Sequence, residues 1–325
     1  MSIIRRLGSG ILTVTLIVAV GAAFIHRQDI IDEIAFRSYQ PTSEIRRIAE
    51  RSGMSETGKR FFYLSNPQLK SADEFNDECR RVEKASAILG CYDQAKSSIY
   101  IYNVKNAELD GIKEVTAAHE MLHAAWVRLS ESEKNRLESL LERAYQKNKN
   151  EKLAKRMSYY DRAQPGSRTN ELHSILGTEF ADVGDELEQH YKRYFNNRAA
   201  VVSLHNNYQQ KFDSAEQEAE SLHNDLAERK SAIDNEMNGY VSELAQYNQR
   251  VSSFNQRAAN GDFPSQQSFQ RERTELQQQL ADLKRRRELL NGQIDRYNAD
   301  VKRLQQLGVR IEELQNSLDS VKEAG

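Results

Sequence analysis

The amino-acid sequence predicts a mostly α-helical protein, in which a minimal α+β domain with a small sheet precedes a long antiparallel coiled-coil hairpin. Long stretches rich in Glu, Gln, Lys, Arg and Asn lack proline and glycine, and the 325 residues include only four prolines. This composition favours extended helices over disorder. Apolar residues recur at helical spacing over much of the C-terminal part, whereas one run, residues 97–104, has the composition of a strand.

The N-terminal segment, residues 1–28, is predicted to be a transmembrane anchor. The 19 residues between Arg6 and His26 carry no charge, and as a helix they span about 28 Å, close to the thickness of the hydrocarbon core of a bilayer. Arg5 and Arg6 precede this run, so the positive-inside rule places the N-terminus in the cytoplasm and the rest outside the cell membrane. The alternative is a cleaved signal peptide, since VGAA contains small residues suited to cleavage, and the protein is then secreted.

The two cysteines indicate a disulfide, and the net charge argues against one class of binding protein. Cys79 and Cys91 are the only cysteines, and because an exported domain lies in an oxidising compartment, we expect them to form a disulfide. The alternative is two unpaired thiols that are buried as small apolar groups. The formal net charge of −2 argues against a dedicated nucleic-acid-binding protein, so we expect no nucleic-acid partner.

Residues 29–195 are expected to form the α+β domain. Residues 27–60 place isoleucines at helical spacing and are broken near 52–58 by SGMSETG. The best strand candidate is SSIYIYNV (97–104), which is suited to pair with an extended peptide at a sheet edge. Few other strands are visible, so we expect any sheet to be small.

The second half of this domain is predicted to be helical. A helix begins near Gly111, and Ser130 with Glu133 fits a capping box that starts the next helix. Pro165 and Gly166 require a loop before the helical segment RTNELHSILGTEF.

Residues 196–325 are predicted to form the coiled-coil hairpin. Apolar residues recur largely at steps of three and four from Tyr208 to Phe254 and again from Leu276 to Val321, and ANGDFPS (259–265) interrupts them. Heptads on both sides of one turn predict that the second helix folds back on the first. The alternative is two helices that pair with another chain, through a coiled-coil partner or a homo-oligomer.

The segment VTAAHEMLHAAW (115–126) carries the residues with the clearest chemistry. His119 and His123 are four residues apart on a predicted helix, so both imidazoles point the same way and can bind one Zn²⁺ ion. Glu120 is offset from the metal and suited to take a proton from a water molecule as general base. The alternative is a helix with two histidines on a buried face.

This HExxH motif resembles that of the zincin class of zinc metallopeptidases. A metzincin continues with a glycine and a third histidine, but this chain reads HAAWVRL after the motif, which excludes that group. The resemblance therefore implies a gluzincin-like enzyme, whose third ligand is a glutamate from a later helix. It covers about residues 95–195 and implies a peptide or protein substrate.

Three residues of RTNELHSILGTEF are candidates for the third ligand: Glu171 first, then Glu179, then His173. Asn170, Glu171 and Ser174 resemble the NExxS pattern of thermolysin-type enzymes. Ile175 stands where that pattern has an aspartate, which removes the expected hydrogen-bonding partner of a histidine.

The two other candidates have separate grounds. Glu179 lies on an apolar stripe, an unusual place for a carboxylate without a partner, and residues 178–182 resemble a gluzincin third-ligand stretch shortened by one residue. His173 shares its face with Gly177, whose lack of a side chain admits a close neighbour. Tyr159 and Tyr160 are candidate donors to an oxyanion.

The sequence thus predicts a membrane-anchored, extracytoplasmic zinc metallopeptidase in which Glu120 activates a water molecule. Two alternatives stay open. In one, the protein is a scaffold or adaptor of the cell envelope whose HExxH helix is degenerate or only binds zinc. In the other, the coiled coil occludes the cleft of a peptidase until a partner binds. A cytosolic SprT-like protease is disfavoured by the exported topology.

Overall fold

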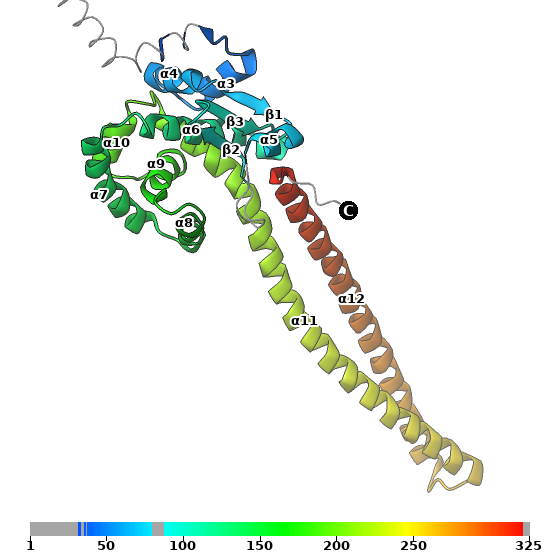
Figure 1. The fold of residues 1–325 in the computed structure, drawn as a ribbon. Helices are drawn as coiled ribbons and strands as arrows, with labels where there is room; N and C mark the ends of the chain where they lie inside the picture. Colours follow the sequence, from blue (N-terminus) through cyan, green and yellow to red (C-terminus); the bar gives the residue numbers. More distant parts are fainter. Residues whose placement is uncertain (1–31, 34–35, 37, 80–87, 321–325) are drawn as a thin grey trace, which may run out of the picture. The chain divides into compact units, whose positions relative to one another are not determined.

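The computed structural model describes residues 32–33, 36, 38–79 and 88–320 of the chain (Figure 1). The chain divides into a first unit, which comprises residues up to Lys211 and from Leu314 onward, and a second unit, Phe212–Glu313. The described residues are mostly helical with one small sheet, as the sequence predicts. The predicted anchor, residues 1–28, lies outside the described residues, and among those that are described no helix is both long and apolar enough to span a bilayer.

The elements follow one another in a mainly helical order. In chain order they are α3 (Ser43–Arg51), α4 (Glu56–Leu64), β1 (Gln68–Lys70), α5 (Ala72–Glu78), β2 (Gly90–Asp93), β3 (Ser98–Tyr102), the 3₁₀ helix η1 (Ala107–Leu109), α6 (Ile112–Trp126), α7 (Glu131–Asn148), α8 (Glu151–Ala163), α9 (Arg168–Glu179), α10 (Asp185–Tyr191), α11 (Arg198–Asn260) and α12 (Gln266–Leu318). The break between α3 and α4 and the loop between α8 and α9 lie where the sequence predicts them.

The sheet has the strand order β1–β3–β2 (Figure 1). β1 is parallel to β3, with Gln68 opposite Tyr100, and β2 is antiparallel to it, with Cys91 opposite Tyr100. The prediction that β3 pairs with a substrate is therefore wrong, because its backbone groups are already bonded on both sides. Among the described strands, β1 and β2 form the edges of the sheet.

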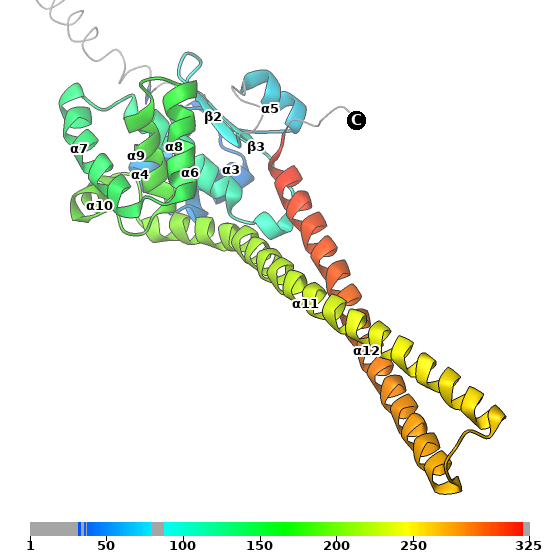
Figure 2. The ribbon, with the colours of Figure 1, turned by 90° about the horizontal axis from the view of Figure 1, so that it is seen from below.

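Helix α6 lies at the centre of the first unit. It packs against α3, α4 and α9 and against strands β2 and β3, and Figure 2 shows α6, α8 and α9 close together. Gly177 of α9 allows the close approach, since a Cβ atom there would lie 2.5 Å from Leu122 Cδ1 and 2.8 Å from Tyr191 Cε1. This confirms the prediction that Gly177 admits a close neighbour.

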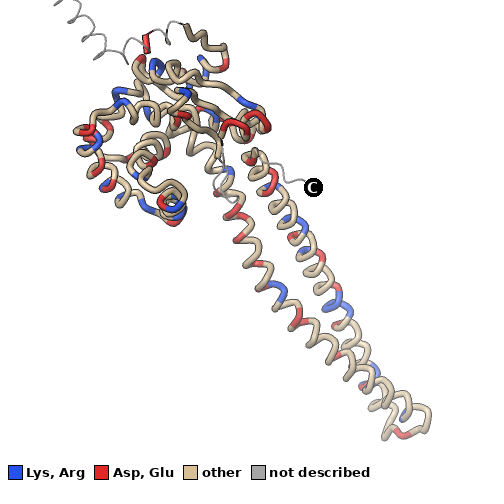
Figure 3. The backbone as a smooth tube through the Cα atoms, viewed as in Figure 1, with Lys and Arg blue, Asp and Glu red and all other residues tan. Residues whose placement is uncertain are grey.

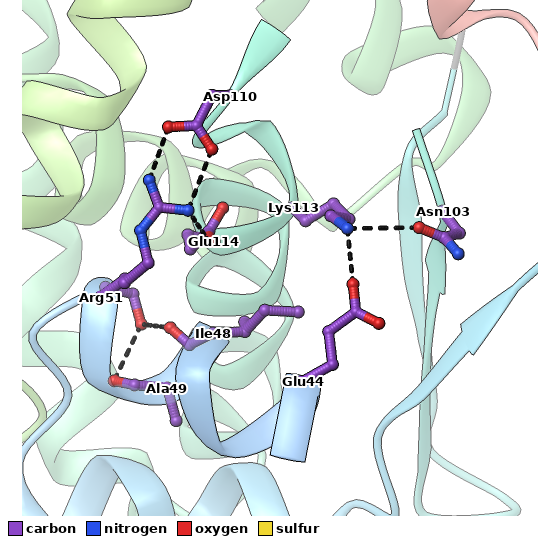
Figure 4. A network of polar contacts seen from close by, with 9 residues as sticks. Glu44, Ile48, Ala49, Arg51, Asn103, Asp110, Lys113 and Glu114 are labelled. Atoms are coloured by element: carbon purple, nitrogen blue, oxygen red, sulfur yellow. Dashed lines mark hydrogen bonds and ion pairs between the residues drawn. The ribbon is translucent and has the colours of Figure 1, made fainter. Parts of the chain in front are cut away.

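Ion pairs fix the beginning of α6 to α3 (Figure 4). The Arg51 guanidinium donates to Asp110 at 2.6 Å and to Glu114 at 2.5 Å, and Lys113 donates to Glu44 at 2.6 Å. Glu114 is buried, with 3 % of its surface exposed. Because a buried carboxylate without a counter-charge is strongly destabilising, the contact with Arg51 helps to set the position of α6.

Helix ends in this unit follow the capping signals of the sequence. Ser130 and Glu133 form the predicted capping box at the start of α7, with the Ser130 side chain accepting from the Glu133 N–H. Gly111, which precedes α6, has φ of +96°, a conformation that glycine adopts without strain.

The second unit consists of the greater part of α11 and α12. Ion pairs join the two helices: Arg229–Asp300, Glu243–Arg286 and Arg257–Glu272. As the residue number rises along α11, the residue number of its partner on α12 falls. Both helices carry both signs of charge along their length (Figure 3). The break between them, after Asn260 and before Gln266, lies at the predicted turn, where the rings of Phe254, Phe263 and Phe269 pack with centroids 5.1–5.3 Å apart.

A disulfide joins Cys79, at the end of α5, to Cys91 of β2, with their Cα atoms 5.9 Å apart. This confirms the pairing that the sequence predicts and rules out the alternative of two free thiols. Because Cys91 belongs to the strand beside α6, the bond ties this strand to α5.

Replacing both cysteines by alanine is expected to lower the free energy of unfolding by about 3 kcal/mol, because the cross-link over a short loop restricts the unfolded chain. Urea unfolding followed by circular dichroism measures the change. Dithiothreitol should lower the midpoint of the wild type and leave that of the double variant unchanged. Equal midpoints for wild type and variant under oxidising conditions would contradict the prediction.

Candidate metal centre

Three side chains that can bind a metal converge between α6 and α9. His119 and His123 lie one turn apart on α6, and Glu171 lies in the first turn of α9. The Nε2 atoms of the histidines are 3.1 Å apart, and each lies 3.7 Å from one oxygen of Glu171. The ligand atoms of this trio, the candidate metal centre, all lie within 4.8 Å of one another.

The geometry of the trio suits a four-coordinate cation. Nitrogen and oxygen ligands at about 2.0–2.1 Å in tetrahedral coordination lie about 3.4 Å from one another, and the distances of 3.1 and 3.7 Å bracket this value. Glu171 Oε2 is also buried without a hydrogen-bond partner. A buried carboxylate oxygen without a donor is costly, and a cation between the three groups would satisfy it.

A hydrogen bond orients the second histidine of the trio. His123 Nδ1 lies 2.9 Å from Asn170 Oδ1 and 3.3 Å from Ser174 Oγ. Because an amide oxygen only accepts hydrogen bonds, His123 carries its proton on Nδ1 and directs the Nε2 lone pair to the centre. Ile175 stands where the aspartate was expected, and Asn170 of the same helix takes the role of that partner for His123.

The charges of the trio are coupled. Burial opposes protonation of His119, but the carboxylates of Glu171 and Glu120 outweigh it and raise the pKa of the imidazole. Burial likewise opposes ionisation of Glu171, but His123 and His119 outweigh it and lower the pKa of the carboxyl. The pocket therefore holds Glu171 as a carboxylate, the form that binds a cation.

Glu120 lies beside the trio, and its side chain fits there because residue 90, which it contacts, is a glycine. It is 5 % exposed, and burial raises the pKa of its carboxyl against the lowering effect of His123 and His119. A Cβ atom on Gly90 of β2 would lie 2.8 Å from Glu120 Oε1 and 2.6 Å from Thr116 Cγ2. The orientation of Glu120 therefore depends on the absence of a side chain at position 90.

A cavity of about 240 Å³ opens onto these groups, and is called the site cavity below. The residues that line it come from α6, from α8 and α9, and from β2 and its flanks: His119, Glu120, His123, Tyr159, Tyr160, Asn170, Glu171, Ile88, Gly90, Cys91, Tyr92 and Gln94 are among them. Both candidate oxyanion donors, Tyr159 and Tyr160, thus face the same space as Glu120. Burial raises the pKa of Tyr160, so its hydroxyl stays protonated and able to donate.

Glu179 takes part in an ion pair at the other end of α9. Its oxygens accept from Arg156 of α8 at 3.0 and 2.5 Å, and His205 Nε2 lies 3.8 Å from Oε2. Burial opposes ionisation of Glu179, but the charge of Arg156 outweighs it and lowers the pKa of the carboxyl. Glu179 thus has the partner that its apolar surroundings require.

His173 forms a buried pair with His190, their Nε2 atoms 2.9 Å apart. Burial and the nearby His190 hold the pKa of His173 well below its usual value, so the imidazole is neutral. Of the three candidates for a third ligand, the structure brings Glu171 to His119 and His123, and places Glu179 and His173 with other partners among the described residues.

Several residues around the centre are not evident from the sequence. Gly90 and Tyr92 belong to a strand of four residues that contains Cys91 and begins at the end of the cysteine loop, too short for an alternating pattern to reveal it. Arg156 lies on a helix with no unusual sequence feature, and only tertiary packing brings it to Glu179.

Comparison with protein-family models, curated proteins and solved structures finds no match to this chain. Its function therefore has to be inferred from the chemistry of the site.

Replacing Glu179 by Gln is expected to lower the free energy of unfolding by about 2 kcal/mol, because it leaves the half-buried Arg156 without its counter-charge. Glu186→Gln is the matched control: it removes an exposed carboxylate that pairs with the exposed Arg143, so the change should stay within about 0.5 kcal/mol. Urea unfolding in the presence of EDTA measures both. Equal losses in the two variants would contradict this assignment of roles.

Proposed function

We propose that this protein is a zinc-dependent metallopeptidase, and that His119, His123 and Glu171 bind the zinc. The observation that carries the proposal is the convergence of these three ligand atoms, with Glu120 alongside, in one cavity. Two histidines, a carboxylate and one position open to the cavity make up a donor set typical of catalytic zinc. The resemblance of the HExxH motif to gluzincin-like zincins supports the same proposal.

Each residue of the site cavity then has a role in hydrolysis. Zinc held by the trio would supply Lewis acidity, which polarises the scissile carbonyl and lowers the pKa of water. Glu120 accepts the proton of the attacking water and passes it to the leaving amine, a role that suits a buried carboxyl of raised pKa. Tyr160, with its protonated hydroxyl in the same cavity, donates to the oxyanion that develops on the carbonyl oxygen.

We propose that β2 binds the backbone of the substrate, in place of β3. β2 lies at an edge of the sheet, and its residues line the site cavity next to Glu120. An extended peptide that pairs with this edge would place a peptide bond beside Glu120. The Cys79–Cys91 disulfide supports this role because it ties the strand to α5.

We also propose that α11 and α12 form an antiparallel coiled-coil hairpin that spaces the peptidase domain from the membrane, recruits a partner or mediates a homo-oligomer. The ion pairs Arg229–Asp300 and Glu243–Arg286 between the helices support the pairing. The disulfide supports an extracytoplasmic location, because such bonds persist in oxidising compartments. Residues 1–28 would anchor the chain in the cell membrane.

The full chain, purified without added metal, is expected to contain close to one zinc ion per chain. Glu171→Ala should lose this zinc, because it removes one of three protein ligands, whereas Glu179→Ala and His173→Ala should retain it per folded molecule. Glu120→Gln should retain zinc and lose peptidase activity on a peptide library by at least about 100-fold. Atomic emission measures the zinc, and mass spectrometry measures the cleavage.

A wild type that holds no zinc, even after zinc addition and dialysis, would exclude the peptidase. The protein would then be better described as an envelope scaffold built on its two long helices.

Gly90→Ala is expected to lower kcat by about tenfold or more while zinc content stays unchanged, because the new methyl group would displace the Glu120 carboxylate. Gly308→Ala is the matched control, since nothing lies within 4 Å of a Cβ atom at that position of α12. Steady-state kinetics on any cleaved peptide measures the change. Unchanged kcat in Gly90→Ala would contradict the role of this glycine.

A further inference from the structure

A second cavity adjoins the site cavity and contains two arginines. It has a volume of about 630 Å³ and shares Tyr92, Gln94 and Val127 with the site cavity. Arg60 and Arg128 line it. A peptide bound along β2 in the site cavity would therefore have room to extend a neighbouring group past these shared residues toward the two guanidinium groups.

Arg128 is held in place by groups other than its ionic partner. It follows α6 by two residues, and its Nη1 donates to the Ala124 carbonyl at 2.8 Å. Its guanidinium carbon lies 5.4 Å from the centroid of the Phe61 ring, a cation–π contact that orients the guanidinium plane. The side chain is 15 % exposed. The two other nitrogens of Arg128, Nε and Nη2, both donate to the carboxylate of Asp32.

Asp32 is the ionic partner of Arg128 in this cavity. It also lines the cavity, where Arg128 Nε donates to Asp32 Oδ2 at 3.3 Å and Nη2 donates to Oδ1 at 3.5 Å. The two contacts form a parallel fork, the geometry in which arginine binds a carboxylate, but both exceed the usual 2.7–2.9 Å. Arg60 has a separate carboxylate partner, because it donates to Glu33, the residue after Asp32, at 2.9 Å.

We propose that Arg128, with Arg60 beside it, forms a subsite for a carboxylate group of the peptide substrate, and that Asp32 occupies this subsite in the absence of substrate. The proposal rests on the peptidase function proposed above and adds to it the class of substrate. The carboxylate comes either from an acidic side chain next to the scissile bond or from the C-terminus of the peptide. Since the fork to Asp32 is long, a substrate carboxylate able to approach more closely would displace it.

The test uses the full chain and begins with a synthetic peptide library, in which cleavage that disappears in Glu120→Gln identifies true substrates. One cleaved peptide is then made with Glu or with Gln at each position flanking the scissile bond, and with a free or an amidated C-terminus. We expect kcat/KM to be at least about tenfold higher for one carboxylate form than for its neutral counterpart. The two sets of peptides distinguish the two sources of the carboxylate.

Variants then assign the preference to the subsite. Arg128→Gln should reduce the ratio of kcat/KM values to near one while the neutral peptide is still cleaved, and Arg128→Lys, which keeps the charge without the fork, should give an intermediate ratio. Asp32→Asn should raise kcat/KM for the carboxylate form because it removes the internal competitor. Arg143→Gln is the matched control, since Arg143 is an exposed arginine that lies 3.5 Å from Glu186 and does not line this cavity.

The outcomes separate this inference from the proposed function. Absence of any cleavage that depends on Glu120 would overturn the peptidase function and this inference with it. Cleavage with equal kcat/KM for carboxylate and neutral forms would overturn the inference alone. If Arg128→Gln cleaves neither form, the wild type and Arg60→Gln provide the test instead. An unchanged ratio of kcat/KM values in Arg60→Gln would confine the subsite to Arg128. A wild-type ratio near one would overturn the inference.

Discussion

The packing of α6 against α9 is the constraint on which the rest of the site depends. Glu171 reaches the two histidines of α6 only because the helices approach closely, and Gly177 leaves the space that Leu122 fills. The alanines on either side of the motif are fully buried and short enough to admit the same approach. A larger side chain at this contact would move the carboxylate away from the imidazoles and separate the trio, although every residue of the motif would still be present.

Buried charges with defined partners hold this contact in one arrangement. Glu114 pairs with Arg51 at one end of α6, and Glu179 pairs with Arg156 at the end of α9. Because a buried charge that loses its partner costs several kcal/mol, each pair restricts where its helix can lie. Glu171 differs from these residues, since it is buried with one oxygen lacking a hydrogen-bond donor. That contrast separates a carboxylate that supports the fold from one that is suited to bind a metal.

Contacts within the first unit hold both segments of chain that lead to the second. Arg198, at the start of α11, is 7 % exposed and donates at 2.7 Å to the carbonyls of Phe180 and Ala181, which follow α9. Near the chain's C-terminal end, Ser320 and Asn76 of α5 exchange two hydrogen bonds of 2.7 and 2.8 Å. Both contacts involve elements next to the candidate metal centre, since α9 carries Glu171 and α5 is cross-linked to β2.

The sequence by itself determined the helical character, the turn between the long helices, the disulfide and the face shared by His119 and His123, because these follow from local spacing, capping and redox chemistry. It left Glu171, Glu179 and His173 open as partners of the histidines, since the packing of α9 on α6 decides which residue reaches them. The sequence also did not determine the order of the strands. Its composition identified β3 as a strand but could not show that β3 is the central strand of the sheet. Only the tertiary structure placed β2 and Gly90 beside Glu120 and Asn170 beside His123, because these contacts join segments whose spacing in the chain carries no periodic signal.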